Sequence, residues 1–389
     1  MKKVLFIMLS LYNGGAEKSL VNLLNELPKD KYDIDLLLFR HEGLFLSQVP
    51  ENVNILETPK NLEALYKPLK ECRADCRITK LVGTLLSRLK KGNTEAARGY
   101  RWINYYSPKI ERLLWHYDVA IAYSPGEQGY YLIDKVDAVK KYIWVHNDYR
   151  KQNFSKEYDK PYFEKADGIV SVSEECVNIL KEEFPEIKDR IFCIENITSS
   201  EVIKKRAVEF IPKEYGNEQV RIISIGRLVQ TKRFDIAIEA AAVLKEMKIK
   251  FRWYILGDGE KYDELLNLIK KTNTEDVIKL IGVRENPYPY IYNADIMVQT
   301  SEHEGKSVAL DEAKILAKPI VVTDYPTVRD QIKDGKEGII SPLNAEGVAN
   351  KISTLIFGES IYNGIKDYLS SRDYGNRDEV EKYIELMEK

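Results

Sequence analysis

Two glutamates in the second half of the chain have a spacing that suits ligand binding. Glu304 is expected in a loop, and Glu312 about two turns inside the helix that the apolar pattern predicts over 307–316. Unpaired N–H groups in the first turn of such a helix attract anions and hydroxyls. Because a carboxylate accepts two hydrogen bonds from a diol, a sugar diphosphate at this helix start would meet Glu304 through its sugar and Glu312 through its ribose. The alternative is a solvated acidic helix start, which the helix dipole also favours.

Two basic residues follow the strand predicted over 221–225. Arg227 and Lys232 come after Gly226 and before a helix predicted over 234–245. The arginine would bind a pyrophosphate through two parallel hydrogen bonds, and the lysine would act as a point charge. Their place after a strand favours this role over the alternative of solvated surface charge, because parallel sheets bind ligands at the carboxyl ends of their strands.

Short β-branched, apolar runs alternate with helical patterns along the chain, which is typical of parallel α/β sheets. Strands are predicted over 3–9, 34–39, 53–56, 118–122, 142–145 and 168–172, and again over 221–225, 252–256, 277–280, 295–299, 319–322 and 338–340. The strand pattern pauses over about 198–219. We therefore predict an α/β protein with two Rossmann-like, doubly wound parallel-sheet domains over 1–200 and 201–371, facing across a cleft. A C-terminal helix is expected within 372–389 and would pack back on the first domain.

Composition narrows the class of protein. With 389 residues, 44% of them hydrophobic and 31% charged, the chain is long enough for two globular cores. The formal net charge of −2 argues against a general nucleic-acid binder. No run of about 18 apolar residues is present, and the apolar start fits a buried first strand better than a signal peptide. We therefore expect a cytoplasmic protein.

Several short motifs together resemble glycosyltransferase family 4. They are the Gly14-Gly15 turn, Gly226-Arg227-Leu228 with Lys232, Gly257-Asp258-Gly259, and Glu304 and Glu312 followed by Pro319-Ile320-Val321-Val322-Thr323. The resemblance runs from about residue 3 to residue 342 and is most specific over 221–341. It implies a GT-B fold, retention of anomeric configuration and no metal. It also implies no cofactor other than a nucleotide diphosphate sugar as donor substrate, with a UDP-sugar expected.

The resemblance assigns roles to individual residues. Arg227 and Lys232 would bind the donor diphosphate. Glu304 would bind the transferred sugar, and Glu312 the ribose. His146 matches the family's histidine near the reacting carbon, and a hydrogen-bonded histidine at a strand end is the open alternative. Further donor contacts would come from residues at loops and helix starts: Gly14, Gly15, Gly226, Val283, Arg284, Gly305, Lys306, Ser307 and Val308. Of these, Val283 and Arg284 lie where the family holds the base.

A basic segment in the first half predicts contact with a membrane. Residues 60–112 hold 13 lysines and arginines against five acidic residues, and residues 77–91 hold five basic residues and no acidic one. Apolar residues recur there at helical spacing: Ile78, Leu81, Val82, Leu85 and Leu89, with Leu86 beside them. A basic amphipathic helix is typical of a membrane-surface element, so residues 77–91 are expected at the inner leaflet. The alternative is a helix that covers its own sheet and leaves its lysines in water.

Together these patterns predict a retaining glycosyltransferase of the hexosyl- or N-acetylhexosaminyltransferase class. It would move a sugar from a nucleotide diphosphate sugar, bound by the second domain, to a glycan or polyprenyl-linked acceptor, bound by the first. The expected setting is cell-surface polysaccharide biosynthesis, such as capsule or exopolysaccharide. Two alternatives stay open. A nucleotide-sugar epimerase of the same architecture would need no acceptor, and a non-catalytic sugar-nucleotide or glycan-binding protein would tolerate the loss of Lys232.

Overall fold

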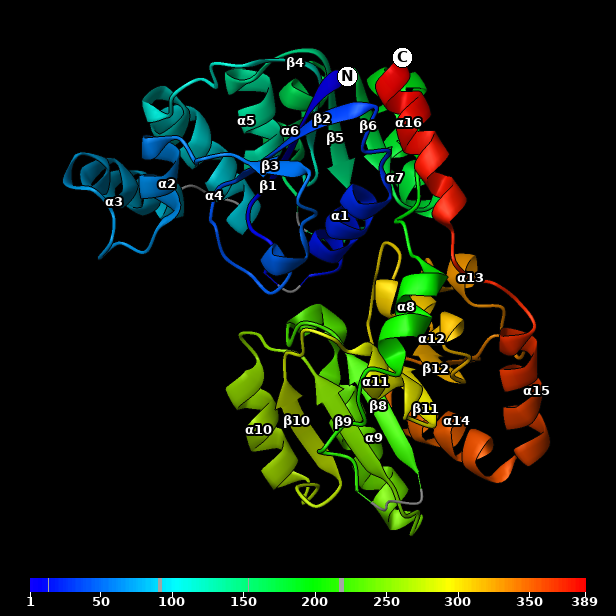
Figure 1. The fold of residues 1–389 in the computed structure, drawn as a ribbon. Coiled ribbons are helices and arrows are strands. Elements are labelled where there is room, and N and C mark those ends of the chain that lie inside the picture. The colour runs from blue at the N-terminus through cyan, green and yellow to red at the C-terminus, as the bar shows by residue number, and fades with distance from the viewer. Residues whose placement is uncertain (13, 90–92, 153, 217–219) are drawn as a thin grey trace. The chain divides into compact units, whose positions relative to one another are not determined.

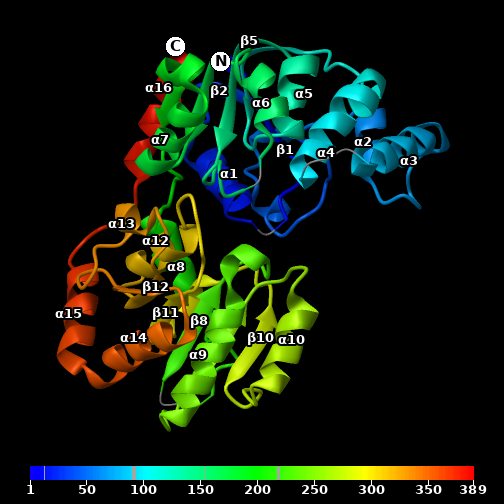
Figure 2. The same cartoon turned by 180° about the vertical axis from the view of Figure 1, so that it is seen from behind.

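The computed structural model describes residues 1–12, 14–89, 93–152, 154–216 and 220–389. The chain forms two compact units, residues 1–196 with 378–389 and residues 197–377 (Figures 1 and 2). Each unit is built around one parallel sheet, which confirms the predicted α/β class with two parallel-sheet domains. Within the described ranges, no helix is both long enough and apolar enough to cross a membrane.

The first unit contains a sheet of seven strands in the order β3-β2-β1-β4-β5-β6-β7. The strands are β1 (Lys2–Met8), β2 (Tyr32–Leu38), β3 (Val53–Ile55), β4 (His116–Ala122), β5 (Asp137–Val145), β6 (Gly168–Ser171) and β7 (Ile191–Cys193). All neighbouring strands run parallel. Strands covered on both faces have no solvent side, which explains the unbroken apolar run from Val4 to Met8.

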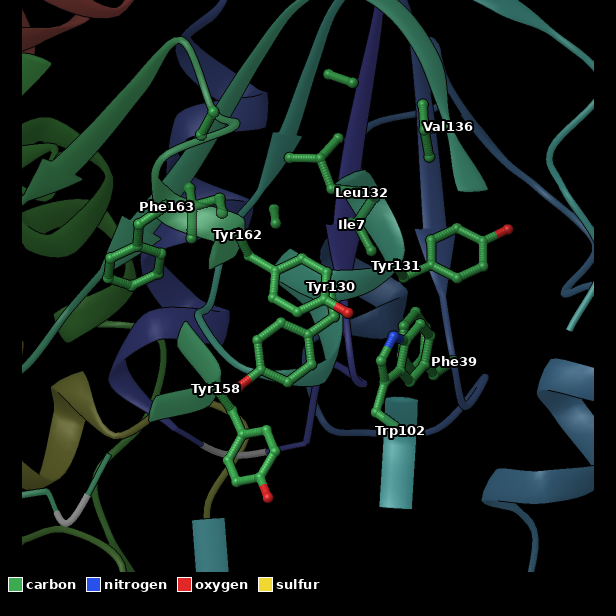
Figure 3. Close-up of a cluster of buried hydrophobic side chains, with 14 of the residues drawn as sticks. Ile7, Phe39, Trp102, Tyr130, Tyr131, Leu132, Val136, Tyr158, Tyr162 and Phe163 are labelled. Carbon is green, nitrogen blue, oxygen red and sulfur yellow. The ribbon is translucent and has the colours of Figure 1, made fainter. Parts of the chain in front are cut away.

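Helices cover this sheet and close its core. They are α1 (Gly15–Glu26), α2 (Lys60–Tyr66), α3 (Ala74–Leu89), α4 (Thr94–Arg101), α5 (Glu127–Lys135), α6 (Lys156–Phe163), α7 (Glu174–Glu183) and α16 (Val380–Glu388), with a π-helical turn at Trp102–Tyr106 (η2) and short 3-10 turns at Leu46–Gln48, Ser107–Lys109 and Pro185–Arg190. Figure 3 shows the aromatic part of the core, where the rings of Tyr130 and Tyr162 stack at 4.2 Å. The ring of Phe39 meets Tyr131 edge-on at 5.5 Å, so the core side of α5 is fixed by aromatic packing.

The C-terminal helix α16 belongs to the first unit, although it is last in the chain. Its Tyr383 ring stacks on Trp144 of β5 at 5.5 Å, with 11° between the ring planes. An ion pair of 2.9 Å joins Glu388 to Lys2 of β1. Within the predicted segment 372–389, the α-helix starts only at Val380, after the short turn Arg377–Glu379 (η6).

The second unit contains a sheet of six strands in the order β10-β9-β8-β11-β12-β13. The strands are β8 (Arg221–Ile225), β9 (Arg252–Leu256), β10 (Ile278–Gly282), β11 (Ile296–Gln299), β12 (Ile320–Thr323) and β13 (Ile339–Ser341). The helices are α8 (Ser200–Ala207), α9 (Phe234–Glu246), α10 (Tyr262–Lys271), α11 (Tyr288–Tyr292), α12 (Val308–Ile315), α13 (Val328–Gln331), α14 (Ala345–Phe357) and α15 (Glu359–Ser370). The predicted boundary at residue 200 therefore falls at the start of α8.

Alternate strand residues of the second sheet feed two separate cores. Ile222 and Trp253 join the cluster with α9, α10, α14 and α15, whereas Ile223 and Tyr254 join the cluster with α8, α11 and α12. This is the consequence of a side-chain period of two in a sheet covered on both faces. The sheet edge at the carboxyl ends of the strands is left for loops, and these loops carry the candidate site.

Candidate functional site

The loop after β8 places Gly226 and Arg227 at the carboxyl edge of the second sheet. The N–H of Gly226 donates to the carbonyl of Leu256 at 3.0 Å. The loop after β9 packs so closely on this point that a Cβ atom on Gly257 would lie 1.8 Å from the carbonyl oxygen of Gly226. Only glycine permits such an approach, so the Gly-Asp-Gly motif fixes the course of the β8 loop. Arg227, the next residue, is exposed.

Lys232 ends the short turn Gln230–Lys232 (η5) between this loop and α9. The next residue, Arg233, has a left-handed backbone with φ of 48°, which turns the chain into the helix. A Cβ atom on Gly226 would lie 3.4 Å from Cδ and Cε of Lys232. The lysine stem therefore runs past Gly226 at van der Waals distance, along the end of the strand.

Lys232 forms an ion pair with Glu304, the loop residue that follows β11. Both side chains are largely sheltered, with 20% and 11% of their surface exposed. Glu304 Oε1 also accepts a hydrogen bond of 2.6 Å from Ser301 Oγ. Among the described residues, Oε1 receives both of these contacts and Oε2 receives none. The structure thus brings together a cation and a carboxylate that sequence analysis identified separately.

Hydrogen bonds hold the loops after β8 and β11 in one arrangement. Thr300 Oγ1 donates to the carbonyl of Lys232 at 3.0 Å, and the N–H of Glu302 donates to the carbonyl of Thr231 at 3.0 Å. Thr327, before α13, donates to the carbonyl of Glu304 at 2.8 Å. Because β8 and β11 are neighbours in the sheet, these bonds fix the Lys232–Glu304 pair before any ligand arrives.

The start of α12 is organised around Ser307 and Gln331. The N–H of Ser307 donates to Gln331 Oε1 at 3.0 Å, and Gln331 Nε2 donates back to the carbonyl of Ser307 at 2.6 Å. Ser307 Oγ donates to Gln299 at 2.6 Å and makes no capping bond to the first turn of the helix. Gly305 is buried and Lys306 half-buried in the loop before it, and Val308 is the first helical residue. Sequence analysis missed Gln331, because a lone glutamine in a short helix carries no motif.

Glu312 is more enclosed than expected. The sequence predicts that Glu312 contacts the ribose of a ligand, but its side chain is only 2% exposed. Its neighbours Asp311 and Lys314 are buried too, and they form an ion pair of 3.2 Å. The reason is that α12 has protein on every side, with buried residues at all but one of its positions.

Val283 and Arg284 follow β10, as the sequence predicts, but the arginine is engaged elsewhere. Its guanidinium forms an ion pair of 2.6 Å with Glu214 and donates to the hydroxyl of Tyr290 at 2.9 Å. A further bond of 3.1 Å reaches the carbonyl of Val283. These contacts give the Arg284 side chain a structural role in the β10 loop.

The candidate residues of the first unit lie at the ends of β1 and β5. Gly14 precedes α1, and a Cβ atom there would come within 2.1 Å of the Glu17 carboxylate; Gly15 is the first residue of that helix. His146 directly follows β5 and is buried, with Nε2 located 3.1 Å from the carbonyl of Tyr123. Burial lowers the pKa of His146 from 6.5 to about 4, so the imidazole is neutral at pH 7.

The described parts of the chain contain no group of three or more histidine, cysteine, aspartate or glutamate side chains arranged to hold a metal ion. Arg227 and Lys232 both lie near the carboxyl end of β8. Metal independence itself stays a prediction, and a chelator experiment tests it below.

Residues 207–370 match the family model described as "Glycosyl transferases group 1". Poly(ribitol-phosphate) alpha-N-acetylglucosaminyltransferase of Staphylococcus aureus is 31% identical over 168 residues, which cover 42% of this chain and 33% of that protein. N-acetylgalactosamine-N,N'-diacetylbacillosaminyl-diphospho-undecaprenol 4-alpha-N-acetylgalactosaminyltransferase of Campylobacter jejuni is 27% identical over 230 residues, 58% of this chain and 61% of that protein. The chain thus spans less than two thirds of the length of these curated relatives.

A solved structure extends the likeness to the whole chain. Anabaena Alr3699/HepE in complex with UDP and glucose aligns over 99% of both chains with a TM-score of 0.71, at 16% sequence identity. At this identity the likeness concerns the fold, which agrees with the two parallel sheets described above. The chain therefore has the GT-B fold, and its residues 207–370 match group 1 of the glycosyl transferases.

Proposed function

We propose that this protein is a retaining glycosyltransferase of family 4 that transfers a sugar from a nucleotide diphosphate sugar to a glycan or lipid-linked acceptor. The observation that carries the proposal is the Lys232–Glu304 pair. It lies at neighbouring strand ends, in loops that hydrogen bonds join to one another. The group 1 match over residues 207–370 covers both partners. A solved neighbour that binds UDP and glucose supports a UDP-sugar as donor.

In the proposed complex the donor diphosphate displaces neither partner of this pair. A lysine ammonium has three donors, so Lys232 can keep Glu304 and also contact phosphate oxygens. The exposed Arg227, which follows β8, would bind the same diphosphate. Glu304 Oε2 would accept hydrogen bonds from the hydroxyls of the sugar. The base would rest on the backbone at Val283, because the Arg284 side chain is held by Glu214.

The reaction proposed for this site needs no nucleophilic side chain. The acceptor hydroxyl attacks the anomeric carbon from the face that the nucleotide leaves, as the bond from that carbon to the diphosphate oxygen breaks. The acceptor proton passes to a phosphate oxygen of the leaving nucleoside diphosphate. Lys232 and Arg227 stabilise the charge that grows on this leaving group. The same cations would replace a divalent ion, so we expect turnover to survive a metal chelator.

The acceptor is proposed to bind the first unit, where His146 follows β5. By their names, one relative acts on poly(ribitol-phosphate) and another on a sugar linked to diphospho-undecaprenol, which favours a polymeric or lipid-linked acceptor and a setting in polysaccharide biosynthesis. Both names also include an N-acetylhexosamine, which makes UDP-N-acetylhexosamines the first donors to test. His146, neutral at pH 7, would serve as a hydrogen-bonding group near the reacting carbon.

The test is a transfer assay with UDP-glucose, UDP-N-acetylglucosamine and UDP-N-acetylgalactosamine, with and without undecaprenyl-diphosphate-linked sugars, beside calorimetric binding of UDP. We expect UDP to bind, an α-linked product from an α-donor, and a dependence on acceptor that survives EDTA. Conversion of the nucleotide sugar without acceptor would identify an epimerase. Binding without any turnover on a broad acceptor panel would favour a non-catalytic protein. Loss of activity in EDTA, restored by magnesium or manganese, would contradict the proposed role of the cations.

A further inference from the structure

Helix α3 packs on the first unit with its apolar face outward. Ile78 is 70% exposed, Leu85 63% and Leu89 73%. The remaining large apolar side chains of the helix, Leu81, Val82 and Leu86, are exposed as well. Its buried residues are instead the small Cys76, Gly83 and Ser87. A helix on a globular protein normally buries its apolar stripe, so this orientation is inverted.

Specific contacts fix this orientation. A Cβ atom on Gly83 would lie 3.0 Å from Cβ of Tyr105, so the glycine allows close approach to the π-helical turn η2. Cys76 Sγ donates to Asn61 of α2 at 3.5 Å, and Lys80 Nζ donates to the carbonyl of Lys67. In both Figures 1 and 2, α3 lies at the outer end of the first unit, beside α2 and α4. The alternative that this helix covers its own sheet with its apolar face is therefore wrong.

Positive charge borders the exposed apolar face. Arg77 and Arg88 are exposed and lie about three helical turns apart, which places them on the same side of α3. The one acidic residue of the helix is Asp75 in its first turn, which forms an ion pair with Arg73. Lys80, expected in the basic face, is turned inward to Lys67, and Lys90 and Lys91 lie outside the described residues.

We propose that α3 docks this protein on a membrane surface that contains anionic lipid. The leucine and isoleucine side chains would enter the boundary between headgroups and acyl chains, and Arg77 and Arg88 would contact lipid phosphates. Charge favours this occupant over a second copy of the chain. A symmetric pairing of α3 faces would bring Arg77 and Arg88 of both copies to one apolar interface, and the one carboxylate of α3, Asp75, is already paired with Arg73 at 2.6 Å. The inference rests on α3 alone and does not depend on the proposed reaction.

The experiment is flotation of the full-length protein with vesicles of phosphatidylcholine alone or mixed with phosphatidylglycerol. We expect binding to the mixed vesicles and release by salt. The double variant Ile78→Gln/Leu85→Gln should bind at least about tenfold more weakly, because each change removes an inserted apolar side chain. Arg77→Gln/Arg88→Gln should weaken binding to the mixed vesicles by about fivefold or more for each charge and bring it toward the level of the neutral vesicles.

The matched control is Ile211→Gln/Phe357→Gln, which removes two apolar side chains that are 78% and 73% exposed in the second unit. It should float like the parent. Equal binding of the parent to neutral and mixed vesicles, or no binding to either, would overturn the proposal. So would a stable dimer that the α3 variants dissociate, because a second copy would then cover the face. Calorimetric UDP binding, measured on the same proteins, separates these outcomes from a failure of the proposed enzymatic function.

Discussion

Helices α12 and α3 depart from ordinary burial in opposite directions. Helix α12 buries three charged residues within about one turn: Asp311, Glu312 and Lys314. α3 leaves Ile78, Leu85 and Leu89 mostly exposed while it buries small residues. Burying charge and exposing large apolar side chains both cost free energy relative to the usual arrangement. A fold retains such features where they are compensated, either by partners inside the protein or by a ligand or surface outside it.

The compensation differs between the two helices. At α12, Lys314 pairs with Asp311 at 3.2 Å and donates to the carbonyl of Gln331 at 3.0 Å, so the protein itself supplies partners. At α3, no part of the described first unit covers the apolar face. The charges of α12 thus find partners within the protein, whereas the apolar face of α3 would be stabilised only by contact with another surface. The predictions below test this contrast, from the largest expected effect to the smallest.

Loss of Lys232 should have the largest effect. Lys232→Ala removes the cation that is held against Glu304 and aimed at the diphosphate of the proposed donor. A preorganised charge in a sheltered site contributes about 2–4 kcal/mol to the transition state, so turnover should fall by about 30- to 10³-fold. Steady-state transfer kinetics measure this. Lys261→Ala, which breaks an exposed pair with Glu264, is the control and should keep parental turnover. Parental turnover in Lys232→Ala itself would remove that residue from the site.

The buried imidazole of His146 should make stability depend on pH. Its pKa falls from 6.5 to about 4 on folding, because burial disfavours the charged form. Above pH 6.5 the histidine is neutral in both the folded and the unfolded state, and the unfolding free energy is at its full value. As pH falls from 6.5 to 4, the unfolded state takes up the proton first, so the unfolding free energy drops by about 3 kcal/mol in total.

The comparison of parent with His146→Gln isolates this contribution. Between about pH 7 and 4.5, the parent should lose more unfolding free energy than the variant, by up to about 3 kcal/mol. Urea denaturation followed at several pH values gives the difference. Parallel pH profiles of the two proteins would contradict the depressed pKa.

A change at Glu312 should weaken nucleotide binding, whereas a change at its buried neighbour Asp311 should not. Glu312→Gln keeps the shape but weakens acceptance from the ribose diol, so UDP should bind about 10- to 100-fold more weakly, equivalent to about 1–3 kcal/mol. Asp311→Asn is the matched control, because it alters a buried carboxylate that is paired with Lys314. It should lower the melting temperature and leave UDP affinity near the parental value. Equal UDP affinity in both variants and the parent would assign Glu312 a structural role only.

The smallest effect is expected for the exposed face of α3. In solution, Ile78→Gln/Leu85→Gln should change the unfolding free energy by no more than about 0.5 kcal/mol, because most of the surface of both side chains faces solvent. Leu132→Ala, in the aromatic core of Figure 3, should cost about 2–5 kcal/mol. A loss in the α3 variant comparable to that of Leu132→Ala would mean that the apolar face is covered within the protein.

The sequence alone determined the class of fold and most of the strands and helices that carry the candidate site. Alternation of apolar runs with helical patterns located both sheets, since strands covered on two faces must be apolar throughout. The helix predicted over 307–316 is α12 at Val308–Ile315, and the strand predicted over 221–225 is β8. These features follow from periodicity and from glycine's backbone freedom, which act within a few residues of one another.

Only the tertiary structure decided which of these residues meet and what each helix face touches. Lys232 and Glu304 are 72 residues apart in the chain and form a pair because β8 and β11 are neighbours in the sheet. Tertiary packing also buries the Glu312 side chain of α12 and pairs Arg284 with Glu214. It brings Gln331 to the start of α12 as well. Periodicity shows that one face of α3 is apolar, but it is the small residues Cys76, Gly83 and Ser87 that allow close packing and turn that face outward. Strand order and close packing join residues that lie far apart along the chain, so no local pattern in the sequence contains them.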